Sequence, residues 1–220
     1  MSKTAFLFPG QGVQKCGMGK DFYENSSQAA KLFEKASEAL GLDMKALCFE
    51  ENARLDQTEY TQAALVTTYL AMCRELESRG VKPDITAGLS LGEYAAIAVA
   101  GAMSDLDAIR LVRKRGMLMQ NTVPTGEGAM CAILALDEKK IEEVLNEIPD
   151  VTIANYNCPG QIVITGKTAA VEMAAARLKE AGARRTLMLN VSGPFHSPML
   201  EPAGAALRQE LEQVTFQKLQ

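Results

Sequence analysis

The sequence has little that would hold a metal ion or a disulfide framework. It contains a single histidine, His196, and five cysteines that are widely spaced and form no CxxC pair. An odd number of separated cysteines argues against a disulfide framework, and the absence of paired histidines argues against zinc. The plain interpretation is reduced thiols in the cytoplasm.

An excess of positive charge is also missing. Lys and Arg total 23 against 27 Asp and Glu, which gives a net charge of -4. This balance lacks the electrostatic footprint of a nucleic-acid-binding protein. Local basic clusters at residues 113–115 and 184–185 are expected to be solvated ends of helices or strands.

Long apolar runs are absent too. No run reaches the roughly 18 residues needed to cross a bilayer, and the apolar stretch near the start is too short for the core of a signal peptide. With 220 residues, 47% of them hydrophobic, the chain is long enough for one large domain or two small ones with a real core.

The first half of the chain alternates strand-like and helical patterns. Short apolar runs predict strands over 4–8 and 85–89, and helical patterns with N-cap and glycine signals follow them. Ser27 is the expected N-cap of the first helix, and Ser104 with Asp107 resembles a capping box. The helices are expected over 27–40, 61–79, 93–100 and 104–120. Strands alternating with helices favour an α/β layer with parallel strands.

A glycine-rich loop over 124–128 precedes a different rhythm. Its elements are expected over 129–136, 137–148, 151–156, 161–165, 168–181 and 185–191, in the order strand, helix, strand, strand, helix, strand. This βαββαβ order is the ferredoxin-like split βαβ pattern. We therefore expect a large domain over 1–124, continued by 196–220 with a helix over 199–214, and an inserted small subdomain over 125–195.

The segment Gly88-Leu89-Ser90-Leu91-Gly92 fits the GxSxG nucleophile elbow, in which a strand turns sharply into a helix. Glycines two before and two after the serine allow strand and helix to approach closely. The turn exposes the Ser90 hydroxyl, and the N-terminus of the following helix favours developing negative charge. The alternative is a glycine-rich turn with a bystander serine.

A serine hydroxyl needs a base, and His196 is the one histidine in the chain. It lies in a loop-like segment and follows the serine, which is the order of nucleophile and base in α/β hydrolases. An acid between them is missing, because the aspartates available look like cap, helix or turn residues; they are Asp105, Asp107, Asp137 and Asp150. Either something other than a carboxylate orients His196, or the chain is not an ordinary hydrolase.

Six separated motifs follow one another along the chain. They are Phe8-Pro9-Gly10-Gln11-Gly12, Thr61-Gln62-Ala63-Ala64-Leu65, Gly88-Leu89-Ser90-Leu91-Gly92-Glu93-Tyr94, Arg115-Gly116-Met117-Leu118-Met119-Gln120, Asn155-Tyr156-Asn157-Cys158-Pro159-Gly160-Gln161-Ile162-Val163-Ile164 and Gly193-Pro194-Phe195-His196-Ser197. Together they resemble the motifs of the malonyl-CoA:acyl-carrier-protein transacylases of bacterial fatty-acid synthesis. Two positions depart from the family pattern: Ala63 stands where proline is usual, and Leu89 stands where histidine is common.

The resemblance implies an α/β-hydrolase-like large domain with a ferredoxin-like subdomain, and an acyltransferase of lipid metabolism. It implies that Ser90 is malonylated, that His196 is the general base and then the acid, and that no metal or redox cofactor is needed. The N–H groups of Gln11 and Leu91 would form the oxyanion hole. The remaining positions, Gln62, Asn155, Phe195 and Arg115, would bind substrate.

Residue chemistry supports Arg115 separately, because a planar guanidinium matches the free carboxylate of a malonyl group. Such a contact contributes roughly 1.5–3 kcal/mol and would discriminate malonyl from acetyl ten- to a hundred-fold. For Gln62, Asn155 and Asn157, polar residues of a helix face or a turn remain an equal interpretation. Phe195 fits a compact malonyl site.

Family members continue past the last helix, and the resemblance implies that the later segment supplies a main-chain carbonyl that orients the histidine. The chain of 220 residues alone is therefore expected to be unstable or inactive. The partner implied is holo acyl carrier protein, which is acidic in this family, so a basic rim is expected to which Arg113, Lys114, Arg184 or Arg185 would contribute.

Two alternatives remain open. A serine esterase or thioesterase would use water as the acceptor, although a carboxylate-binding Arg115 has no purpose for a generic ester. An inactive fragment or carrier-docking module would never complete the site, and labelling of Ser90 by an active-site serine probe separates it from an enzyme.

Overall fold

The computed structural model describes residues 3–124, 126–189, 191 and 193–219. Two compact units make up the chain: the first is Met1–Met117 with Leu207–Gln220, and the second is Leu118–Ala206. The expected subdomain boundary at residue 125, and residue 190 of the strand expected over 185–191, lie outside the described residues.

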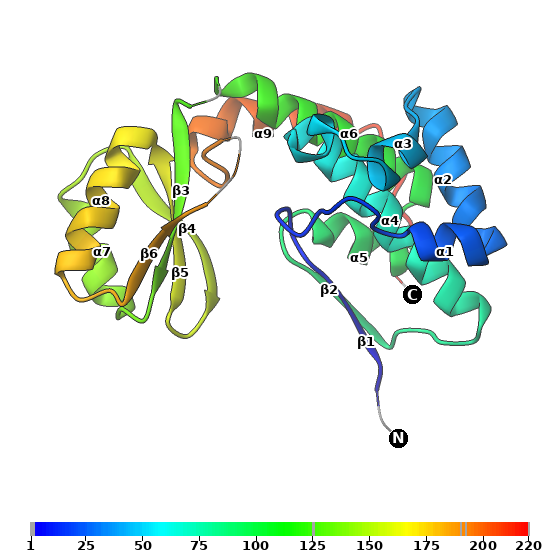
Figure 1. Ribbon diagram of the computed structural model, residues 1–220, viewed down its shortest axis with the longest axis horizontal. Helices are drawn as coiled ribbons and strands as arrows, with labels where there is room; N and C mark the ends of the chain where they lie inside the picture. Colours follow the sequence, from blue (N-terminus) through cyan, green and yellow to red (C-terminus); the bar gives the residue numbers. More distant parts are fainter. Residues whose placement is uncertain (1–2, 125, 190, 192, 220) are drawn as a thin grey trace. The chain divides into compact units, whose positions relative to one another are not determined.

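The first unit contains a parallel pair of strands, β1 (Ala5–Phe8) and β2 (Ile85–Gly88), in the register Ala5↔Ile85 through Phe8↔Gly88. Helix α5 (Gly92–Val99) packs on both strands, which Figure 1 shows beside it. The α/β organisation with parallel strands, expected from the alternating pattern, is confirmed.

The other helices of this unit gather around one apolar core, in which Leu65, Leu70 and Phe33 are fully buried. Their bounds are α1 (Lys20–Asn25), α2 (Ser27–Leu40), α3 (Met44–Phe49) and α4 (Thr58–Ser78), with a 3-10 turn over Ala53–Asp56. Two further helices extend from one unit into the other along the chain, α6 (Asp105–Thr122) and α9 (Glu201–Leu211). The sequence did not predict α1 and α3, because six residues are too few to show a helical period.

The N-cap of α2 corrects one expectation. Ser26, and not Ser27, is the cap: its Oγ accepts a hydrogen bond from Ala29 N at 3.1 Å. Either serine could cap by its local chemistry. The Ser26 hydroxyl also donates to the Glu75 carboxylate of α4, and this contact between helices favours Ser26. The Ser104 cap is as expected, since Asp107 N donates to Ser104 Oγ at 3.1 Å.

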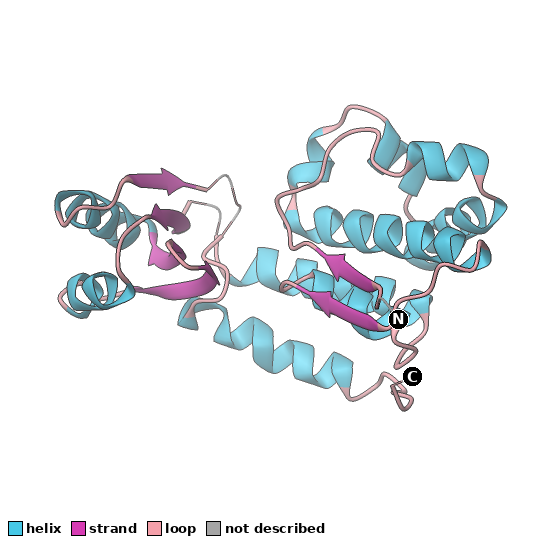
Figure 2. Ribbon diagram, turned by 90° about the horizontal axis from the view of Figure 1, so that it is seen from below, coloured by secondary structure: helices cyan, strands magenta, loops and turns pink. Residues whose placement is uncertain are grey.

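The second unit is an antiparallel four-stranded sheet with the order β4-β5-β3-β6. Its elements are β3 (Gly128–Leu134), α7 (Glu138–Asn146), β4 (Val151–Cys158), β5 (Gln161–Lys167), α8 (Thr168–Glu180) and β6 (Arg185–Met188). Figure 2 shows α7 and α8 as a pair beside the sheet.

Successive residues of the central strand β3 belong alternately to two apolar clusters. Cys131 and Ile133 of β3 pack in the cluster that contains the residues of α7 and α8, while Met130 and Ala132 pack with Phe195. Neighbouring residues of a strand point to opposite faces, so both faces of this sheet are covered.

Candidate functional site

Ser90 occupies the turn between β2 and α5 and has a left-handed backbone, with φ of 51°. A non-glycine residue held at positive φ stores strain that the surrounding structure must support. A Cβ on Gly88 would lie 2.1 Å from the backbone carbon of Gly92, and a Cβ on Gly92 would lie 2.1 Å from the carbonyl oxygen of Phe8. Only glycine fits at either position, so the tight approach of strand, loop and helix produces the serine turn.

Arg115 reaches this serine from α6. Its Nη2 donates a hydrogen bond to Ser90 Oγ at 3.1 Å, and the Arg115 residue is only 9% exposed. The next residue, Gly116, allows the approach, because a Cβ there would lie 2.7 Å from the carbonyl oxygen of Thr58. The RGxxMQ motif therefore combines the arginine that contacts Ser90 with the glycine that brings its helix close to α4.

The surroundings of Arg115 are aromatic. Its guanidinium carbon lies 5.5 Å from the ring centroid of Tyr94, and no carboxylate among the described residues forms an ion pair with it. Burial lowers the pKa of the Arg115 guanidinium, and Tyr94 and Glu93 oppose this shift. A guanidinium stays protonated at any physiological pH, so the serine turn has a desolvated cation next to it.

Gln11 anchors the loop after β1. Its Nε2 donates to Thr58 Oγ1 at 3.1 Å, and its Oε1 accepts a hydrogen bond from Gln62 Nε2 at 3.4 Å. A Cβ on Gly10 would lie 3.1 Å from the carbonyl oxygen of Leu89, so this loop lies against the serine turn. Within the described part of the chain, the backbone N–H groups of Gln11 and Leu91 donate to no protein acceptor. Sequence reasoning identified Gln11 and Gln62 but missed Thr58 and Tyr94.

His196, Phe195 and Asn155 belong to the second unit. His196 is exposed and has φ of 59°, a second left-handed non-glycine backbone at a residue expected to be functional. Phe195 before it is 7% exposed and packs in the cluster with Met130 and Val163. Asn155 is half-buried in β4 at a register shift of the sheet.

The aspartates between Ser90 and His196 all have structural partners. The pairs are Asp105 with Arg74 at 2.6 Å, Asp107 with Ser104 at 2.7 Å, Asp137 with Lys139 N at 3.0 Å and Asp150 with Lys167 at 2.8 Å. These contacts agree with the sequence interpretation that none of these carboxylates is placed as a catalytic acid.

The basic cluster over 113–115 divides by helix face. Arg113 pairs with Glu59 at 2.8 Å and stacks on Tyr60, while Lys114 pairs with Glu210 at 3.1 Å. Arg113 is therefore a structural contact between α6 and α4. Arg184 and Arg185 are exposed, just before and at the first residue of β6.

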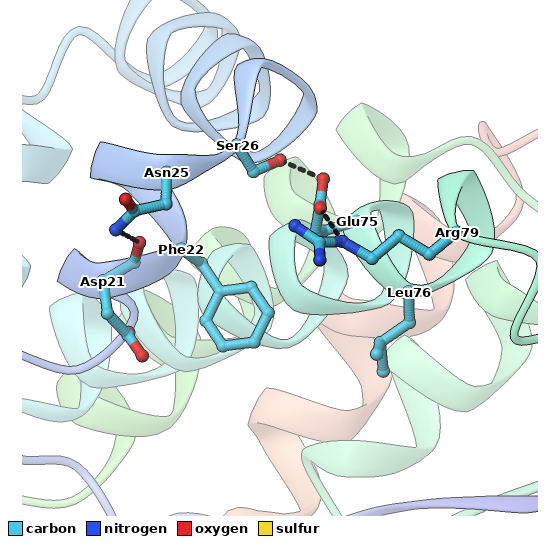
Figure 3. A pocket seen from close by; sticks show the side chains of 7 residues that line it. All are labelled: Asp21, Phe22, Asn25, Ser26, Glu75, Leu76 and Arg79. Atoms are coloured by element: carbon cyan, nitrogen blue, oxygen red, sulfur yellow. Dashed lines mark hydrogen bonds and ion pairs between the residues drawn. The ribbon is translucent and has the colours of Figure 1, made fainter.

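A pocket of about 340 Å³ lies elsewhere in the first unit, between α1, the N-cap residue of α2 and the C-terminal end of α4 (Figure 3). Ser26 and Arg79 both bind the Glu75 carboxylate there, and none of the expected site residues lines it. In the residues that the structure describes, no cluster of three His, Cys, Asp or Glu side chains could hold a metal ion, and no helix is long and apolar enough to cross a membrane.

Comparison with known proteins gives the class first. A family model described as acyl transferase domain matches residues 5–220. The α/β framework that carries the serine turn and the buried arginine is thus that of an acyl transferase domain.

Curated and solved relatives then narrow the class. The chain is 48% identical over 217 residues to malonyl CoA-acyl carrier protein transacylase of Bacillus subtilis (strain 168), covering 96% of this chain and 68% of the relative. For the Staphylococcus aureus (strain MSSA476) protein of the same name the identity is 42% over 206 residues, with coverages of 91% and 66%. The chain spans about two thirds of the length of these curated relatives.

Two solved structures of malonyl transacylases are also similar to this chain. The transacylase of Clostridium perfringens aligns with a TM-score of 0.94 at 44% identity, over 99% of this chain and 70% of that one. A complex of a type II PKS acyl-carrier protein with its malonyl-transacylase aligns with a TM-score of 0.96 at 41% identity, over 100% and 72%. The chain belongs to the malonyl CoA-acyl carrier protein transacylase family.

Proposed function

We propose that this protein moves a malonyl group from malonyl-CoA, through an ester on Ser90, to the phosphopantetheine thiol of an acyl carrier protein. The observation that carries the proposal is the Arg115 guanidinium, which is buried and donates to Ser90 Oγ at 3.1 Å. A generic ester hydrolase has no need for a desolvated cation beside its nucleophile. A substrate with a carboxylate near the reacting carbonyl does need one.

The reaction has two halves. Ser90 Oγ attacks the thioester carbonyl, its proton passes to His196, and the C–S bond breaks as His196 returns that proton to the sulfur of CoA. The carrier-protein thiol then attacks the Ser90 ester, His196 takes the thiol proton, and the proton returns to Ser90 Oγ as the ester bond breaks.

The oxyanion formed in each half would be stabilised by the backbone N–H groups of Gln11 and Leu91. Leu91 is the N-cap of α5, so its N–H lies at the positive end of that helix. The Gln11 side chain is held by Thr58 and Gln62, and a loop fixed in this way needs no reorganisation when charge develops. Removal of one such donor typically costs a hundred- to a thousand-fold in kcat.

The remaining roles come from the family motifs. His196 is proposed as the base and then the acid. Gln62, Phe195 and Asn155 are proposed to line the malonyl site. The cytoplasmic setting expected from the cysteine pattern is part of the same proposal.

We also propose the finer architecture. The large domain, 1–124 with 196–220, is α/β-hydrolase-like, and 125–195 is an inserted ferredoxin-like subdomain. The strand order β4-β5-β3-β6 with a helix after β3 and another after β5 supports the second assignment, because it is the order of the split βαβ pattern. The strand–serine–helix turn on a parallel strand supports the first.

An acyl carrier protein is the proposed acceptor, since relatives are named for it and one solved neighbour is a complex with a carrier protein. The alternative with water as acceptor, a serine esterase or thioesterase, has no comparable observation in its favour.

The test is the intact mass of the 220-residue chain after brief incubation with malonyl-CoA and, separately, with acetyl-CoA. We expect a malonyl adduct on wild type, far less acetyl adduct, and neither on Ser90→Ala; this outcome would overturn the expectation from the sequence that the 220 residues alone are inactive. Holo acyl carrier protein is then added. The malonyl adduct should disappear from the chain, and the mass of the carrier protein should rise by that of one malonyl group. Folded wild type that forms no adduct would refute this activity for the chain.

A further inference from the structure

Arg115 is unusual among the arginines of the first unit in the kind of partner it has. Arg74 and Arg113 are partly buried and pair with carboxylates, at 2.6 Å to Asp105 and 2.8 Å to Glu59. Arg115 is more deeply buried, yet its partners are the hydroxyl of Ser90 and the side chain of Tyr94, and no carboxylate is paired with it.

We infer that Tyr94 is a positioning residue that determines malonyl specificity by holding the Arg115 guanidinium over its ring, and this inference rests on the proposed function. A guanidinium donates its hydrogen bonds in its own plane, while its two faces interact with aromatic rings. An aromatic partner therefore leaves N–H donors for a substrate carboxylate. A protein carboxylate would instead occupy them.

The geometry supports this division of roles. The guanidinium carbon lies 5.5 Å from the Tyr94 ring centroid, within the roughly 6 Å range of cation–π contacts. Tyr94 lies in the first turn of α5, four residues after Ser90, so the element that carries the nucleophile also carries the ring. The Nη2 atom of Arg115 donates to Ser90 Oγ, so this edge of the guanidinium lies beside the atom to which the acyl group would be attached.

Desolvation makes the contact important. Arg115 is 9% exposed, so water compensates little for its buried charge. Without the ring, the side chain would gain by turning toward solvent, and the carboxylate of the substrate would have to order it again on binding. This reordering weakens the binding of malonyl substrates. Acetyl substrates have no carboxylate, so their binding is unaffected.

The experiment measures KM and kcat for malonyl-CoA and acetyl-CoA with Tyr94→Leu and Tyr94→Phe. Tyr94→Leu should raise the KM for malonyl-CoA about ten-fold with kcat changed less than about two-fold, and should leave the KM for acetyl-CoA as it was. Tyr94→Phe keeps the ring but loses the hydroxyl that also interacts with Arg115, so its KM for malonyl-CoA should rise less than that of Tyr94→Leu, with the KM for acetyl-CoA unchanged.

Tyr60→Leu is the matched control, because Tyr60 of α4 is also half-buried against the same core. The centroid of its ring lies 4.4 Å from the guanidinium carbon of Arg113, and Arg113 is on the same helix as Arg115. It should leave the ratio of the two KM values unchanged. An equal rise of KM for both substrates in Tyr94→Leu would show a merely structural role and overturn the inference.

A second readout is independent of the proposed activity. The side-chain N–H resonance of Arg115, assigned by its absence in Arg115→Lys, should feel the ring current of Tyr94. It should move in Tyr94→Leu and stay near its place in Tyr94→Phe and Tyr60→Leu. If wild type transfers no malonyl group, the proposed function fails, and an unmoved resonance in Tyr94→Leu separately refutes the positioning of Arg115 by Tyr94.

Discussion

Arg115 Nη2 lies 3.1 Å from Ser90 Oγ and donates a hydrogen bond to it. The two residues are 25 positions apart, on α6 and in the turn before α5. The contact places a desolvated positive charge beside the hydroxyl of the strained serine turn.

Replacing the planar guanidinium of Arg115 should change the preference of the protein for malonyl-CoA over acetyl-CoA. Arg115→Lys keeps a positive charge but loses the planar pair of donors. We expect kcat/KM for malonyl-CoA to fall ten- to a hundred-fold, and kcat/KM for acetyl-CoA to fall much less. Steady-state kinetics with both substrates measure this directly. Equal losses for the two substrates would mean that Arg115 supports the fold of the site and does not read the carboxylate.

The glycines of the serine turn should tolerate no side chain. Gly92→Ala places a Cβ 2.1 Å from the Phe8 carbonyl oxygen, and we expect the free energy of unfolding to fall by roughly 3 kcal/mol. The matched control is Gly204→Ala in α9, where a Cβ meets nothing within 4 Å. That variant should gain roughly 0.5–1 kcal/mol because alanine favours helix. Urea denaturation compares the two, and equal stabilities would contradict the crowding of the turn.

Glu75 should make stability depend on pH. Hydrogen bonds from Ser26 and from Arg79 lower the pKa of the Glu75 carboxyl below its usual value. A carboxyl whose pKa is lowered on folding stabilises the fold above its unfolded pKa, near 4.3, and this contribution disappears as pH falls through the lower folded value. Glu75→Gln should therefore lower Tm at pH 7 and lower it less at pH 3. The same loss of Tm at both pH values would refute this linkage.

The cysteines should react in an order set by burial. Burial raises the pKa of the Cys48 and Cys73 thiols to about 12 and that of Cys131 to about 11, and thiolate is the reactive form. Cys158 is exposed on β4. Iodoacetamide at pH 8 should label Cys158 first, and peptide mapping should find the three buried cysteines labelled only in denaturant. Native labelling of Cys48 as fast as that of Cys158 would show that the core of the first unit opens readily.

Local signals in the sequence predicted much of the secondary structure. Caps and glycine stops predicted α2, and the expected strands over 4–8 and 85–89 correspond to β1 and β2 within a residue. The six-residue helices α1 and α3 carry no periodic signal and were missed. The choice of Ser26 over Ser27 as cap depends on Glu75, 49 residues away, which no local rule can identify.

The site divides in the same way. The elbow is a local structure, because Gly88, Ser90 and Gly92 stand at the end of one strand and the start of one helix, and their spacing alone requires the turn. The packing of Phe195 into an apolar cluster and the placement of Tyr94 against Arg115 involve elements distant in sequence.

The sequence by itself determined the glycines of the serine turn and, through the family resemblance, pointed to Arg115 as the arginine of the site, with Arg113 and Lys114 expected on a basic rim. Only the tertiary structure decided which partner each of these three residues has. Successive residues of a helix are rotated by about 100°, so Arg113 meets Glu59, Lys114 meets Glu210, and Arg115 alone of the three faces Ser90. Packing of α6 against α4 at Gly116 determines that rotation, because no other residue would let the two backbones approach so closely.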